Sequence, residues 1–181
     1  MPPYLSIPHY HLSRLPVTTK VALTGFSLSL VGAVLFVTVA VFGERTDYDV
    51  KGVQANFAGD ERVTRETGAK FDTLVAEKSR RALYDIVHPH SFMIPLVYFV
   101  LCHLMEMTYA PRGVKIALYA GSFVAMTLVT AAPLLVAWKL AFGWVVIPAV
   151  VGLGASFLVM TVVPTWQMWF TRDRPLRGPA S

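Results

Sequence analysis

Two histidines and a carboxylate lie close together along the chain, at Asp85, His88 and His90. Imidazole nitrogens bind copper and zinc, and alternating residues of an extended backbone can converge on one ion. The same histidines could instead contact a haem or a quinone, or hydrogen-bond to headgroups, water or backbone at a membrane surface. The sequence therefore leaves three interpretations of this group: a metal site, a cofactor contact and a plain interfacial position.

A third histidine, His103, lies in the apolar segment that follows, three residues before Glu106. A charge at the centre of a membrane span costs about 2.5 to 3.5 kcal/mol on insertion scales, so an ionisable residue there is a functional candidate with a partner to be named. His103 can stay neutral, and we expect it either to hydrogen-bond across the bundle or to ligate a haem iron. Glu106 lies near the end of its segment, where we expect it to pair with Arg112 or Lys115.

The separation of His90 and His103 limits what they could bind together. Thirteen residues of helix span about 20 Å, which is comparable to the spacing of two stacked haems in membrane b-type cytochromes. On an ideal helix, however, the two rings point about 140° apart, and no other apolar segment carries a histidine. A second axial ligand would have to come from Met126, Met160, another copy of the chain or another subunit. We therefore expect at most one b-type haem, or a quinone, at these histidines.

Other kinds of chemistry have no candidate residues. The sequence contains no nucleophile elbow, phosphate-binding glycine loop, metalloprotease helix or pair of catalytic carboxylates. Its single cysteine, Cys102, can form neither an internal disulfide nor the C-x-x-C-H attachment site of a c-type haem. The net charge of +5 comes from basic residues scattered over loops and ends, which is not typical of a nucleic-acid-binding surface. We expect no independent catalytic site, and at most the role of a non-catalytic subunit of an oxidoreductase.

Long apolar segments must position these groups. Hydrophobic residues make up 55% of the chain and charged residues 15%, against about 25% charged residues in soluble domains. Four windows reach or approach the roughly 20 apolar residues that cross a bilayer core, and the first is too long and begins too late for a signal peptide. The sequence therefore predicts an all-α integral membrane four-helix bundle. Its predicted parts are an interfacial N-terminal strap at 1–19, span 1 at 20–43, a polar loop at 44–87, span 2 at 89–109, span 3 at 114–138, span 4 at 144–169 and a basic tail at 170–181.

The polar loop at 44–87 holds half of the basic residues and most of the acidic ones. In its second half, apolar residues recur at helical spacing and charged residues occupy the rest of the helical wheel. This pattern predicts an amphipathic extramembrane helix between spans 1 and 2, lying on the membrane surface or packed on a partner subunit. The apolar positions are Phe71, Leu74, Val75, Leu83, Ile86 and Val87.

Two further features concern packing and orientation. In span 1, Gly25 and Gly32 lie seven residues apart on nearly one face, where another helix could approach closely. Short flanks on the side of the termini carry more Lys and Arg than the opposite short link, where Lys139 is the basic residue. The positive-inside rule then predicts cytoplasmic termini and a periplasmic 44–87 loop, although the basic residues within that loop count against this orientation.

Five sequence features follow one another along the chain in a characteristic order. They are a glycine-rich first span, a polar loop containing Tyr48 to Gly59, His88-Pro89-His90-Ser91-Phe92, Ala132-Pro133 and Thr165-Trp166-Gln167-Met168-Trp169. Together they cover most of residues 17–170 and resemble a group of poorly characterised bacterial four-span membrane proteins found in respiratory and electron-transfer settings. Some members of that group carry a c-type haem motif in the first loop, which implies an electron-transfer role beside larger redox complexes. The motif is absent here, and His88 and His90 are left as the matched candidate site.

The histidines and the resemblance together predict an accessory subunit of a bacterial electron-transfer complex, respiratory or photosynthetic, in the inner membrane. In this hypothesis His88, His90 and His103 contact a b-type haem or a quinone. The expected partners are the lipid bilayer and a larger membrane complex, and no nucleic acid. A purely structural or assembly subunit is the alternative, and a metal-handling membrane protein that uses Asp85, His88 and His90 is the third hypothesis.

Overall fold

The structure is a computed structural model that describes residues 11–71 and 75–171. Over these residues every regular element is a helix, and four helical segments are long and apolar enough to cross a membrane. The prediction of an all-α membrane bundle with four spans is therefore confirmed. The spans are Val17–Thr46, Arg80–Glu106, Arg112–Trp138 and Leu140–Phe170.

The helices follow one another with short connections, except in the segment between the first two spans. In chain order they are η1 (Leu12–Arg14), α1 (Val17–Leu35), the π-helix η2 (Phe36–Phe42), α2 (Gly43–Thr46), α3 (Val50–Ala58), α4 (Asp60–Thr67), α5 (Arg80–Glu106), α6 (Arg112–Trp138), η3 (Leu140–Phe142) and α7 (Gly143–Phe170).

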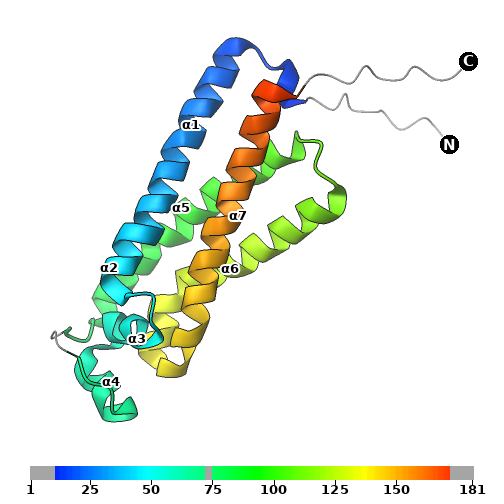
Figure 1. Ribbon diagram of the computed structural model, residues 1–181. Coiled ribbons are helices and arrows are strands. Elements are labelled where there is room, and N and C mark those ends of the chain that lie inside the picture. Colours follow the sequence, from blue (N-terminus) through cyan, green and yellow to red (C-terminus); the bar gives the residue numbers. More distant parts are fainter. Residues whose placement is uncertain (1–10, 72–74, 172–181) are drawn as a thin grey trace, which may run out of the picture.

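Helix α7 is the centre of the bundle and packs against α1, α5 and α6 (Figure 1). Their shared core contains large apolar side chains such as Leu101, Met105, Phe157 and Met160. The start of α1 and the end of α7 lie at the same end of the bundle as the α5–α6 turn, whereas α2, α3, α4 and the α6–α7 turn lie at the opposite end. This is the arrangement expected of four antiparallel spans joined by short links.

The four spans differ in how much they bury. In α6 and α7, 33% of the most apolar stretch is buried, compared with 6% in the first span and in α5. Most of the surface of α1 and α5 therefore faces outward, toward lipid or toward other proteins.

The polar loop folds differently from the prediction. Its helices, α3 and α4, lie in the first half, whereas residues 68–71 and 75–79 are not helical and Leu74 lies outside the described residues. Gly68 has a φ of 74° and ends α4 in the left-handed conformation that glycine favours. Beyond it, the Asp60 N–H donates to the Val75 carbonyl at 3.0 Å, and the Val75 N–H donates to Asp60 Oδ2 at 3.1 Å. These contacts hold the segment in a non-helical path, so the predicted amphipathic helix from Phe71 to Val87 is wrong as a single unit.

Helix α5 also begins earlier than predicted. Ser79 is its N-cap, because the Ser79 side chain accepts a hydrogen bond from the Ala82 N–H at 3.2 Å. The helix then continues through Pro89, which was expected to mark the start of span 2. At the other end of the bundle, α1 begins directly after Pro16, so the last residues of the predicted 1–19 strap are already helical and residues 1–10 lie outside the described part.

The loop closes one end of the bundle. Val53 of α3 is fully buried against Val136 of α6 and Val146 of α7. The Gln54 side-chain amide donates to the Leu140 carbonyl at 2.9 Å, and the Arg62 guanidinium donates to the Ala137 carbonyl at 2.6 Å. The loop therefore packs on its own chain, over the α6–α7 turn.

Candidate functional site

All three candidate histidines lie on one continuous helix, α5. The prediction that an extended backbone lets His88 and His90 converge on one ion is therefore wrong. Residues two apart on a helix do not face each other. Asp85 and His88 are three residues apart and share a face. Among residues 11–71 and 75–171, no group of three His, Cys, Asp or Glu side chains lies close enough to hold a metal ion.

The three histidine side chains are exposed, and two of them make the same hydrogen bond. Nδ1 of His90 lies 2.6 Å from the Ile86 carbonyl oxygen, and Nδ1 of His103 lies 3.2 Å from the Phe99 carbonyl oxygen. A carbonyl oxygen only accepts, so Nδ1 carries the proton in both rings. In the neutral ring Nε2 then keeps its lone pair, which is the arrangement used when a histidine ligates a metal through Nε2.

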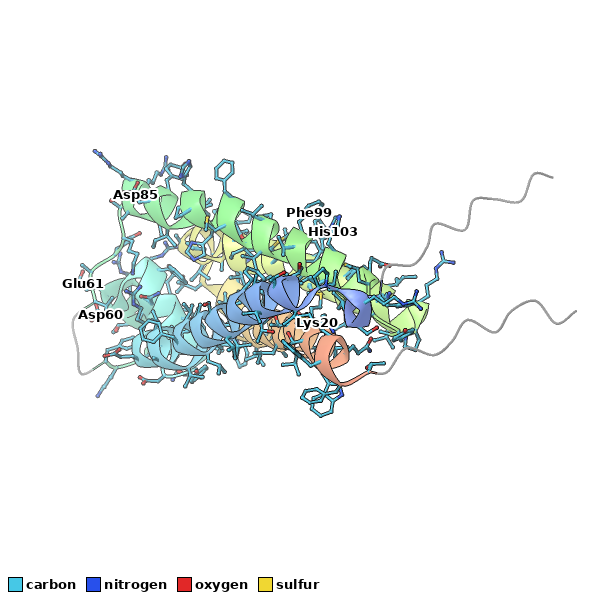
Figure 2. The ribbon with its side chains drawn as sticks, turned by 90° about the horizontal axis from the view of Figure 1, so that it is seen from above. Lys20, Asp60, Glu61, Asp85, Phe99 and His103 are labelled. Carbon is cyan, nitrogen blue, oxygen red and sulfur yellow. The ribbon has the colours of Figure 1, made fainter. Side chains whose placement is uncertain are left out.

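Aromatic side chains accompany the histidines on the outside of α5. The rings of His103 and Phe99 lie 4.4 Å apart, and those of His88 and Phe92 lie 5.3 Å apart. Figure 2 shows Phe99 and His103 next to each other on the outer side of the bundle, with Asp85 on the same helix near its loop end. Each ring contact joins residues one helical turn apart, so it orients the imidazole without using a neighbouring span.

The carboxylate of Glu106 is held by helix α6. The Tyr119 hydroxyl donates to Glu106 Oε1 at 2.8 Å, and Lys115 Nζ lies 3.6 Å from Glu106 Oε2. Lys115 is buried and also donates to the carbonyls of Glu106, at 2.8 Å, and Thr108, at 3.1 Å. The predicted pairing of Glu106 with Lys115 is confirmed. Tyr119 was missed by sequence reasoning, although its position one helical turn after Lys115 was a usable signal.

Neither of the two methionines expected as axial ligands lies beside His103. Met126 and Met160, the two candidates from the sequence, are buried in the bundle core with Leu101 and Met105. His103 is exposed on the other side of α5. Met126 and Met160 therefore do not supply a sixth ligand for an iron at His103.

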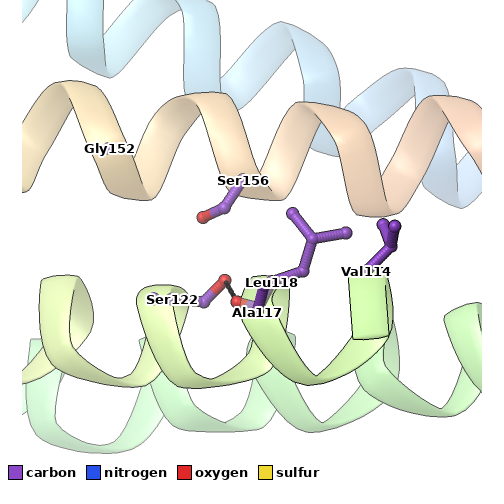
Figure 3. Close-up of a pocket in the computed structure, with 7 residues that line it drawn as sticks. Val114, Ala117, Leu118, Ser122, Gly152 and Ser156 are labelled. Carbon is purple, nitrogen blue, oxygen red and sulfur yellow. Dashed lines mark hydrogen bonds between the residues drawn. The ribbon is translucent and has the colours of Figure 1, made fainter. Parts of the chain in front are cut away.

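A hollow of about 440 Å³ lies between α6 and α7 (Figure 3). Its lining is apolar or small, and its two serines bond to their own helices: Ser122 donates to the Leu118 carbonyl at 2.6 Å and Ser156 to the Leu153 carbonyl at 2.9 Å. No histidine lines it. The lining residues are Val114, Ala117, Leu118, Gly121, Ser122, Gly152 and Ser156.

Comparison with known proteins gives one match. A family model described as a transmembrane helical domain, Aq_1264_TM, matches residues 47–175. The matched range contains α3 to α7 and with them all three candidate histidines. No curated protein and no solved structure matches the chain.

Proposed function

Since the chain belongs to the Aq_1264_TM family of transmembrane helical domains, we propose that it serves as an accessory subunit of a bacterial electron-transfer complex in the inner membrane. In this role α5 faces a neighbouring subunit, and His88, His90 and His103 contact a b-type haem or a quinone held at the interface. The positive-inside rule supports cytoplasmic termini and a periplasmic loop for this arrangement.

The observation that carries the proposal is the state of His103. It is an imidazole on the outer side of a membrane span, with Nδ1 bonded to the Phe99 carbonyl. A polar side chain on the outer side of a span calls for a partner, and none of the other described spans supplies one to Nε2. The lone pair on Nε2 could ligate a haem iron or accept the hydroxyl proton of a quinol.

Spectroscopy and quinone extraction test this function together. The complex would be purified with the wild-type chain and with His88→Ala, His90→Ala and His103→Ala, and Met93→Ala would serve as the control because Met93 is exposed on the same helix. We expect the histidine variants to lose a haem band in reduced-minus-oxidised spectra or to lose bound quinone, with lower turnover. Absence of both cofactors, together with unchanged turnover in the histidine variants, would contradict the proposal.

The alternative of a purely structural subunit has its own observation. A Cβ added at Gly25 or Gly32 would meet nothing within 4 Å, so none of the described residues packs closely against α1 at these two positions. A large side chain there should leave the fold intact and disturb only a neighbouring helix. Blue-native gels of Gly25→Leu and Gly32→Leu should then show loss of assembly, with Gly113→Leu as a control in similarly open space. Normal assembly of both α1 variants would exclude this alternative.

A further inference from the structure

The side of α5 that faces away from the core carries seven exposed residues at regular spacing. Successive members are 3, 4, 4, 3, 4 and 3 residues apart, and the exposed Arg81 lies four residues before the first of them on the same side. Steps of 3 and 4 residues place these side chains on one face of a helix, along which a second helix can lie. We call this surface the outer face of α5, and it consists of Asp85, His88, Phe92, Leu96, Phe99, His103 and Glu106.

The polar members of the outer face lie at its two ends. Asp85 and His88 form one acid–histidine pair near the loop, and His103 and Glu106 form the other near the α5–α6 turn. Glu106 lies 21 positions after Asp85, which is about 31 Å of helix, close to the roughly 30 Å of a bilayer core. The pairs therefore lie toward the two membrane boundaries, with the apolar side chains at the depth of the lipid tails.

We propose that the outer face of α5 packs against the same face of a second copy of the chain, in a parallel two-fold dimer. A two-fold interface requires a surface that complements itself. Across such an axis each residue lies near its own counterpart and near residues one turn away. Asp85 then meets His88 of the second copy, and His103 meets Glu106 of the second copy.

The groups at the α5–α6 end have capacity for this contact. Glu106 is bonded to Tyr119 and Lys115, yet its side chain is 61% exposed and a carboxylate offers about four acceptor positions. His103 has committed only Nδ1, to the Phe99 carbonyl. A hydrogen bond between His103 and Glu106 of the second copy needs one proton. The proton is on Nε2 if the imidazole donates, and on the carboxyl if Nε2 accepts.

The dimer deepens the proposed function and rests on it only in placing a subunit against α5. It names that subunit as a second copy of this chain, which also brings a second His103 to the same depth. A different protein or lipid against this face would require no matching of acids and histidines on the face itself.

Cysteine cross-linking in native membranes tests the dimer. With Cys102→Ala in the background, Phe99→Cys should form an interchain disulfide on mild oxidation, because the axis brings the two copies of this position within the short Cα separation that a disulfide needs. Met93→Cys is the matched control: Met93 and Phe99 are both 59% exposed, but Met93 lies off the outer face. We expect a band at twice the chain mass for Phe99→Cys alone. No such band, equal bands for both variants, or a band joined to another polypeptide would overturn the dimer.

A charge substitution gives a second readout. His103→Glu places a carboxylate opposite Glu106 of the second copy, so native mass spectrometry should show loss of the dimer. Met93→Glu adds the same charge to the same helix off the face and should retain it. A dimer that survives His103→Glu would overturn the inference. Haem and quinone measured in the same samples separate the two proposals: a dimer with neither cofactor leaves the dimer standing and the redox function overturned, and a monomer with a cofactor does the reverse.

Discussion

The polar loop between the first two spans and the outer face of α5 both carry polar side chains. The two regions differ in which groups form hydrogen bonds with those side chains. In the loop, Arg62 donates to the Ala137 carbonyl and Gln54 to the Leu140 carbonyl, so the chain's own helix ends accept the hydrogen bonds. On the outer face of α5, the hydrogen bond of His103 goes to the preceding turn of the same helix. The two loop side chains therefore contribute to stability, whereas Nε2 of His103 remains available to a partner.

Apolar side chains in the two regions differ in the same way. Val53 and Val63 of the loop helices are fully buried, while Phe92 and Phe99 of α5 are 67% and 59% exposed. In water this exposure alone would mark a binding surface, but in a bilayer lipid can cover it. The polar groups are thus the more informative residues on α5, since lipid tails cannot hydrogen-bond to them.

The largest effect in this comparison should come from the loop, at Gly52. A Cβ there would lie 2.1 Å from the Thr46 carbonyl oxygen, a backbone atom that cannot rotate away. We expect Gly52→Ala to lower the free energy of unfolding by about 3 kcal/mol or more, the upper end of the cost of overpacking, because the clash is with backbone. Thermal unfolding in detergent, followed by tryptophan fluorescence, measures it. Gly25→Ala, in open space, is the control and should lose no stability. Equal midpoints for the two variants would contradict the packing described for α3.

A smaller loss should follow removal of the Arg62 guanidinium. This group donates to the Ala137 carbonyl at 2.6 Å and to Glu66 at 2.9 Å, and it joins the loop to the end of α6. Hydrogen bonds to charged groups contribute about 1.5 to 3 kcal/mol, so Arg62→Met should destabilise the chain by an amount in this range. Arg65→Met removes an exposed arginine of the same helix and is the control. If both variants unfold at the same denaturant concentration, the loop does not depend on this contact.

The number of spans was predictable from the sequence because it depends only on local apolar length. The pairing of Glu106 with Lys115 was predictable for a related reason, since the short link between α5 and α6 brings both residues to one end of the hairpin. Neither conclusion required knowledge of how distant segments meet.

The loop and the candidate site were harder to predict. The helical periodicity from Phe71 to Val87 is real, but the two hydrogen bonds between Asp60 and Val75 compete with it, and no local pattern reveals them. Span 2 was expected to begin at Pro89, yet α5 begins at Arg80 and runs through Pro89. Because the helix is continuous through Pro89, the side chains of His88 and His90 point in different directions and do not converge. The contact of Arg62 with Ala137 joins residues 75 positions apart, which sequence spacing cannot indicate.

The pH dependence of stability should report on one loop residue, Lys78. Burial lowers the pKa of Lys78 from its usual 10.5, and the charge of Arg45 lowers it further. Between the lowered pKa and 10.5, the unfolded chain binds this proton more fully than the folded chain does. The contribution of Lys78 to stability therefore rises with pH across that window. The unfolding free energy of the wild type should therefore rise relative to that of Lys78→Met as pH approaches 10.5. A difference that stays flat over this window would contradict the effect of burial.

The smallest change in stability should come from the outer face of α5, and its smallness is what distinguishes the two regions. His103 is exposed and bonded only to its own helix, so His103→Ala in the isolated chain in detergent should alter the unfolding free energy by no more than about 0.5 kcal/mol. Lys115→Met, on the facing helix of the same hairpin, removes two hydrogen bonds from a buried ammonium and should cost about 1.5 to 3 kcal/mol. A His103→Ala variant as unstable as Lys115→Met would mean that the imidazole stabilises the fold itself. It would contradict the conclusion that His103 is available to a partner.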